Sequence, residues 1–166
     1  FALVTGGSLS GAINGGAGAT NTLDYSGFAG PVAVNLTNSS ATGINVGAAN
    51  GFNAITKMKG SGGSDTIAGS DQTFNLTGLN AGSNGTVSWT SFENLQVTGG
   101  SNSIAGLSGS LSGTLTTNAA STTALSGTIT TTGAQTYSGV VTAGVAGVTL
   151  NTGTGAAAAS ITANNT

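Results

Sequence analysis

The stretch "GGSDTIAG" at residues 62–69 returns as "GGSNSIAG" at residues 99–106. Both copies keep the glycine pair and the isoleucine, whereas the only charged residue, Asp65, becomes Asn102. A metal site would preserve the carboxylate, because hard cations bind carboxylate oxygens. The pattern instead predicts a glycine corner followed by an inward apolar strand. The 65/102 position is then expected to point outward or to line the corner, where Asp and Asn serve equally.

Short segments rich in β-branched residues surround this motif. Examples are "PVAVNL" (31–36), "ENLQV" (93–97), "GTLTT" (113–117) and "GTITT" (127–131). Such segments often alternate apolar with polar residues and are separated by Gly, Asn or Ser, a pattern typical of half-buried strands. No window shows the apolar period of a helix together with capping residues, so almost no α-helix is expected.

Longer repeats suggest how these strands are organised. "NLT" occurs at 35–37 and again at 75–77, within a loosely kept repeat of roughly 37–40 residues that covers residues 1–106. Residues 107–166 are uncharged and rich in Thr, Gly and Ala, and "LSGTLTT" (111–117) returns there as "LSGTITT" (125–131). All-strand repeats with glycine corners are typical of solenoids, in which a single coil cannot fold alone and stacking supplies the shared core.

The sequence therefore predicts one all-β domain over residues 1–166, a parallel β-solenoid (β-helix) of about seven to eight coils with about 20–24 residues each. Phe52 and Phe92 are expected to stack on one inner face, two coils apart. The expected corners are Gly15, Gly16, Gly62, Gly63, Gly99 and Gly100. The expected core stack is Phe52, Phe92, Ile55, Leu95, Ile67 and Ile104.

Composition excludes several classes of protein. Charged residues make up 4% of the chain, and all six precede residue 94, so no electrostatic attraction to nucleic acid is expected. Hydrophobic residues make up 37% and mean hydropathy is +0.22, which argues against a disordered linker. No apolar run is long enough to cross a bilayer, so no membrane insertion is expected. Cysteine is absent, which excludes disulfides.

Few side chains are available for chemistry. The chain has no His, no Cys and four carboxylates, of which Asp65 and Asp71 are the nearest pair in sequence. We expect these two to cap turns, so the sequence predicts no enzymatic activity. In "SWTSFENL" a strand would place Trp89 and Phe92 on opposite faces. Phe92 is then expected in the core, with Trp89 exposed or at a corner as the candidate ligand-binding residue.

Three segments carry a resemblance to a known class of protein: residues 15–36, "WTSFENLQVTGGSNS" (89–103) and "TTTGAQTYSGVVTAGVAGVTLNT" (130–152). They resemble repeat segments of large secreted bacterial surface proteins, the filamentous haemagglutinin-like and autotransporter-like adhesins. The resemblance implies a right-handed parallel β-helix that forms a stalk or fibre outside the cell, at the bacterial surface. Adhesion or toxin delivery would then reside elsewhere in a longer polypeptide.

A second, partial resemblance concerns "GSGGSDTIA" (60–68), which is similar to the calcium-binding nonapeptide of secreted solenoids. Ser61 departs from that motif, and the later copy carries Asn102 in place of the aspartate. The matching positions are Gly60, Gly63, Asp65 and Ile67. Because calcium takes six to eight oxygen ligands, no cofactor is expected, and Asp65 is the single metal candidate.

The ends, "FALV" and "SITANNT", lack the charges with which solenoids blunt their terminal strands. We therefore expect each end to be covered by further polypeptide or by another copy of the chain. The sequence favours a non-catalytic structural segment of an adhesin stalk or fibre. Two alternatives stay open: a filament subunit that stacks end to end, and a module that binds host or surface glycans through Trp89 and its Asn/Thr-rich faces.

Overall fold

The computed structural model describes residues 1–18, 20–44, 51–153 and 160–163. Within these residues the chain forms strands and no helix, which confirms the all-β prediction. The strands are β1 (Ala2–Val4), β2 (Ile13–Asn14), β3 (Thr22–Gly27), β4 (Ala33–Asn35), β5 (Ser40–Ala41), β6 (Phe52–Asn53), β7 (Lys57–Lys59), β8 (Thr66–Ser70), β9 (Thr73–Gly78), β10 (Ala81–Ser83), β11 (Ser88–Thr90), β12 (Asn94–Gly106), β13 (Ser110–Leu111), β14 (Leu115–Thr117), β15 (Ser121–Thr131), β16 (Gln135–Tyr137), β17 (Val140–Thr152) and β18 (Ile161–Ala163).

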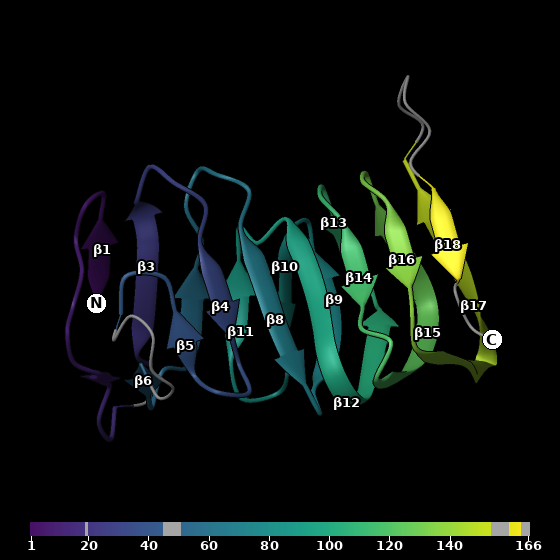
Figure 1. Cartoon of the computed structure of the whole chain (residues 1–166), viewed down its shortest axis with the longest axis horizontal. Coiled ribbons are helices and arrows are strands. Elements are labelled where there is room, and N and C mark those ends of the chain that lie inside the picture. Colours follow the sequence, from purple (N-terminus) through teal and green to yellow (C-terminus); the bar gives the residue numbers. More distant parts are fainter. Residues whose placement is uncertain (19, 45–50, 154–159, 164–166) are drawn as a thin grey trace.

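Sixteen of these strands belong to one curled sheet, and β2 pairs with β6 in a separate two-stranded sheet. The sheet extends along the long axis of the molecule, with β1 at one end and β17 and β18 at the other (Figure 1). Most pairings are parallel. The pairs β4–β5, β9–β10 and β10–β11 are antiparallel, so the sheet is mixed.

Strand β12 shows how the sheet curls. Its first part pairs with β8 from residue 94 and with β14 over residues 95–97, whereas its second part pairs with β15 over residues 100–106 and with β9 over residues 103–106. The direction changes at Gly99 and Gly100, which have φ of 152° and 69°. Side chains other than glycine rarely adopt these values, so the tandem glycine allows the strand to bend and continue in a second part of the sheet.

The spacing between parallel partners differs between the two halves of the chain. In the second half the spacing is regular, because Leu95 lies opposite Leu115 and Leu115 lies opposite Gln135. In the first half the spacing is longer, since Val34 pairs with Ile67. The longest parallel series among the described strands runs from β4 through β8, β12, β14 and β16 to β18. The expected seven to eight coils of uniform length are therefore not observed.

The sequence repeats do not stack on one another. Ile67 pairs with Leu95, whereas Ile104 pairs with Phe74 on one side and Leu125 on the other. The two copies of the opening motif therefore lie in different parts of the sheet. Each repeat corresponds to a local unit, a corner followed by a strand. The repeats do not determine how many residues separate one layer from the next.

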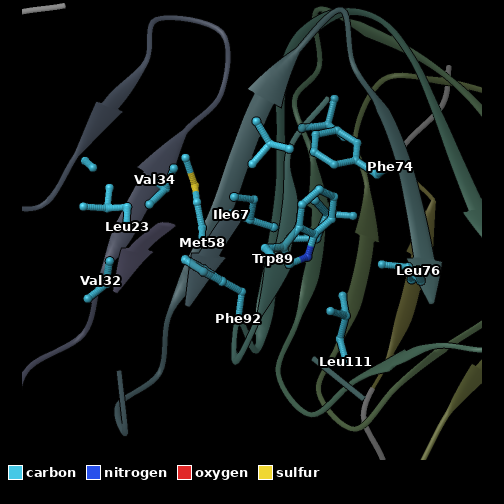
Figure 2. Packing of buried hydrophobic residues seen from close by; sticks show 14 of the residues in the cluster. Leu23, Val32, Val34, Met58, Ile67, Phe74, Leu76, Trp89, Phe92 and Leu111 are labelled. Atoms are coloured by element: carbon cyan, nitrogen blue, oxygen red, sulfur yellow. The ribbon is translucent and has the colours of Figure 1, made fainter. Parts of the chain in front are cut away.

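One continuous hydrophobic core fills the curl. All six residues of the expected core stack are buried. Figure 2 shows Met58, Ile67, Trp89 and Phe92 directed into the same cluster. A direct stack of Phe52 on Phe92 is not observed, because the ring contacts among the described residues join Tyr25 to Phe28 and Phe74 to Trp89.

The other predicted corner glycines fall into different classes. Gly16 has φ of 72° and requires the left-handed region. Gly15 and Gly63 lie against neighbouring backbone, where a Cβ would crowd the Ala54 carbonyl or the Gly30–Pro31 peptide. Gly62 has neither a positive φ nor a close neighbour, so the structure gives no reason for glycine there.

The core becomes partly polar toward the C-terminal strands. Gln135 occupies the inward position that Leu95 and Leu115 fill in the two preceding layers, and it is fully buried. Its Nε2 donates to the Ile129 carbonyl at 3.2 Å and to the Asn151 carbonyl at 3.0 Å. The hydroxyl of Tyr137 donates to Gln135 Oε1 at 2.8 Å. The buried amide is thus hydrogen-bonded on both its nitrogen and its oxygen.

Candidate functional site

Asp65, the single metal candidate, is a buried structural group. Its side chain is 0% exposed, so of the two expected placements, outward or lining the corner, Asp65 takes the second. Oδ1 accepts hydrogen bonds from the Val32 amide at 2.7 Å and from the Ser61 hydroxyl at 2.8 Å, and Oδ2 accepts one from the Ser61 amide. The carboxylate therefore joins two segments that are distant in sequence, and both of its oxygens are engaged.

Asn102, the counterpart of Asp65 in the second copy, is also buried, but its side chain donates hydrogen bonds where that of Asp65 only accepts them. Its Nδ2 donates to the carbonyls of Gly99 and Gly100 at 2.7 and 3.0 Å, and its Oδ1 accepts from the Gln72 amide at 3.0 Å. A carboxylate has no proton to donate to those carbonyls. The two residues line a corner as expected, but Asp and Asn do not serve equally.

The remaining carboxylates also hold neighbouring groups in place. Glu93 Oε2 accepts from the Asp65 amide at 2.8 Å, and its Oε1 accepts from Asn80 Nδ2 at 3.1 Å. Asp71 Oδ1 accepts from the Ser101 amide at 2.9 Å, so Asp65 and Asp71 each cap a different segment. Among the described residues no three His, Cys, Asp or Glu side chains gather as metal ligands do.

Asp24 is the outward-facing carboxylate of β3. Hydrogen bonds from Ser26, through both its side chain and its backbone, lower the pKa of Asp24 below its usual value, and the Lys59 charge adds to this effect. Lys59 lies directly opposite Asp24 in the β3–β7 pairing. Asp24 and Lys59 therefore interact with each other at the protein surface and, among the described residues, do not form part of a larger group of charged side chains.

Trp89, the candidate ligand-binding residue, is 1% exposed, so the prediction of an exposed or corner position is wrong. Its ring contacts Phe74 edge-on at a centroid distance of 6.2 Å (Figure 2). The reason is local: β11 ends at Thr90, and Ser91 has a left-handed φ of 59°. This reverses the strand alternation, so Trp89 and Phe92 both face inward. No ligand can stack on a ring that is buried in this way.

A recess that the sequence did not predict lies beside β6 and the β10–β11 turn. Its volume is about 480 Å³. Six uncharged hydrogen-bonding side chains and five apolar ones line it, and none of these carries a charge. The lining residues are Leu36, Ser39, Phe52, Asn53, Ala54, Ile55, Thr56, Gln72, Asn84, Thr86 and Val87. They come from four separate segments, so no contiguous motif marks the recess in the sequence.

The polar side of the recess is fixed by hydrogen bonds. Asn84 Oδ1 accepts from the amides of Thr86 and Val87 at 3.0 and 2.7 Å, which sets the plane of its amide. Asn84 Nδ2 donates to Gln72 Oε1 at 2.8 Å, and Gln72 Nε2 donates to the Ser70 carbonyl at 3.1 Å. Each of the two side-chain nitrogens carries a second proton beyond these bonds.

Comparison with known proteins gives no match. No family model, no curated protein and no solved structure corresponds to this chain. In the part of the chain that the structure describes, no helix has the length and apolar character needed to cross a membrane.

Proposed function

We propose that this chain is a non-catalytic structural segment of a stalk or fibre in a secreted or surface-attached bacterial adhesin. The observation that carries the proposal is the column of buried side chains Val34, Ile67, Leu95 and Leu115, which runs through successive parallel strands. A column of this kind extends a chain along one axis and buries a core at every step. The engagement of Asp65, Asp71 and Glu93 in backbone and side-chain contacts also favours a structural role.

We further propose that the curled sheet is a right-handed parallel β-solenoid. The even spacing of the parallel pairings in β12, β14 and β16 supports this reading. The bend of β12 at Gly99 and Gly100, which lets one strand pair in two parts of the sheet, supports it as well. In this proposal, the coils of the second half have the basic length. The longer coils of the first half, and the antiparallel strands β9, β10 and β11, contain extra segments inserted into coils of that length.

Immunogold labelling of intact cells of the source organism, with antibodies raised against the purified chain, tests the location. We expect gold at the cell surface or on extracellular material without permeabilisation. Labelling that requires permeabilisation would contradict the proposal. Small-angle X-ray scattering of the same chain tests the shape, for which we expect an elongated monomer.

A second candidate, a filament subunit that stacks end to end, is favoured by the two edges of the sheet. Among the described pairings β1 pairs only with β3, and β17 pairs only with β15. Exposed apolar side chains lie at both edges, including Phe1 and Val4 at one and Val140 and Val145 at the other. Both edge strands lack charged residues, which natural sheets commonly use to block edge-to-edge association.

Scattering at increasing protein concentration distinguishes the two candidates. A filament subunit is expected to lengthen with concentration, and Val145→Lys should abolish this growth, because an edge charge opposes strand pairing. The control is Thr116→Lys, on the outer face of β14. A length that does not change with concentration would exclude the filament.

A further inference from the structure

The recess between β6 and the β10–β11 turn is a built feature of the fold. In the second half of the chain, the interval 115–135 is enough to reach the next layer. The corresponding intervals of the first half, 34–67 and 58–89, are clearly longer. Every residue that lines the recess belongs to one of these two longer intervals. The longer intervals therefore supply the walls of the recess, with Phe52, Ile55 and Val87 of the core beneath them.

Two residues with an unusual backbone conformation lie in the same place. Ser39 and Ala54, which both line the recess, have positive φ values of 52°. Such values are costly for residues with a Cβ, and they persist where the surrounding structure imposes them, commonly at ligand sites. Two of the five described non-glycine residues with positive φ thus lie in this one lining.

The chemistry of the lining indicates the class of ligand. Small-molecule sites occupy roughly 300–1,000 Å³ and are mostly apolar with a few polar groups, whereas here uncharged polar side chains outnumber apolar ones. The absence of charge among the lining residues disfavours phosphate, carboxylate and ammonium ligands. Amides and hydroxyls both donate and accept, which suits a ligand with many hydroxyl groups. Leu36 and Ala54, the apolar lining residues that are not buried, offer a small apolar surface for the C–H face of such a ligand, above the buried Phe52, Ile55 and Val87.

We propose that this recess binds a neutral saccharide unit of a glycan. The second amide protons of Gln72 and Asn84 donate to sugar hydroxyls, and their fixed planes reduce the entropy lost on binding. This site is separate from Trp89, which is buried and has no access to a ligand. The proposal goes beyond the structural role, and surface labelling tests that role independently.

An array of neutral and sialylated oligosaccharides, probed with the fluorescently labelled chain, tests the site. We expect binding to neutral members of the array. Thr86→Trp fills the recess from an exposed position and should weaken this binding at least about tenfold. The matched control is Thr90→Trp, a nearby exposed threonine on the outer face of β11, which should leave binding within about twofold of the parent.

A second variant tests the hydrogen-bonding chemistry without blocking the recess. Gln72→Met keeps the length of the side chain and removes its amide, together with its bonds to Asn84 and the Ser70 carbonyl, so binding should weaken about tenfold while circular dichroism at the assay temperature shows a folded chain. It also provides the readout if Thr86→Trp does not fold. Binding to no glycan on the array, binding to charged glycans alone, or equal effects of Thr86→Trp and Thr90→Trp would each overturn the proposal.

Discussion

The opposite hydrogen-bonding roles of Asp65 and Asn102 predict that the two residues cannot be exchanged, although the sequence repeat exchanges them. In Asp65→Asn, Oδ1 can still accept from Val32 and from the Ser61 hydroxyl. The new amide nitrogen then faces the Ser61 amide, donor against donor. A buried donor without an acceptor costs about 1–3 kcal/mol, and the remaining bonds lose their charge assistance. We expect a loss of about 3 kcal/mol in the free energy of unfolding.

Asn102→Asp should cost a similar amount for the reverse reason. The new carboxylate oxygen would face the carbonyls of Gly99 and Gly100, so two hydrogen bonds are replaced by repulsion, at about 3 kcal/mol. Burial beside carbonyl oxygens raises the pKa of the new carboxyl in the folded state. The stability that its proton provides is therefore present below about pH 4 and is lost as pH rises, so the penalty should be larger at neutral than at acidic pH.

Urea unfolding followed by far-ultraviolet circular dichroism and by the fluorescence of the single tryptophan measures both effects. The matched control is Asp24→Asn, an outer-face carboxylate that accepts from the Ser26 amide, which should stay within about 0.5 kcal/mol of the parent. If both exchanges in the motif also stayed within about 0.5 kcal/mol, the assignment of opposite polarities would be refuted.

Other substitutions and conditions have equally definite outcomes. Leu115→Ala should lower the free energy of unfolding by about 2–5 kcal/mol, whereas Thr116→Ala on the outer face should change it by less than about 0.5 kcal/mol; urea titration compares them. Burial raises the pKa of Tyr25 and Tyr137, so the stability that their protons provide is complete at neutral pH and should fall above about pH 10, where tyrosines of the unfolded chain ionise. Ultraviolet titration should then show tyrosine ionisation together with unfolding, and separate transitions would contradict this. The fluorescence of Trp89 should be blue-shifted and resist acrylamide quenching, and exposed-indole emission would refute its burial. Calcium and a chelator should leave the melting temperature unchanged, while a calcium-dependent rise would reveal a site that these contacts do not explain.

The strands could be predicted from sequence because their signal is local. β-Branched segments between glycine-rich corners predicted an all-β chain, and the alternation within them identified inward residues such as Ile67 and Leu95. The spacing of the layers could not be predicted in the same way. A repeat in sequence reports where a corner requires glycine, whereas the partner of a strand depends on how many residues the intervening loop contains.

The candidate sites depended on contacts that no local pattern encodes. One left-handed residue, Ser91, reverses the alternation after β11 and moves Trp89 from the surface to the core. The role of Asp65 depends on the Val32 amide, which lies far earlier in the chain. The recess is assembled from four segments, so no contiguous pattern marks it in the sequence.

The buried amide of Gln135 has a consequence for the fidelity of folding. A column of leucines and isoleucines cannot by itself distinguish one layer from the next, so a chain with similar segments risks pairing a strand with the wrong neighbour. Displacement of β17 by one layer would separate Gln135 Nε2 from the Asn151 carbonyl, whereas the Ile129 carbonyl and the Tyr137 hydroxyl are close in sequence and would stay beside Gln135. One hydrogen bond of the buried amide would then be lost, with the amide itself still buried. The glutamine thus distinguishes one layer of an otherwise uniform stack, and its bond to Asn151 favours the observed registration of β17 beside it.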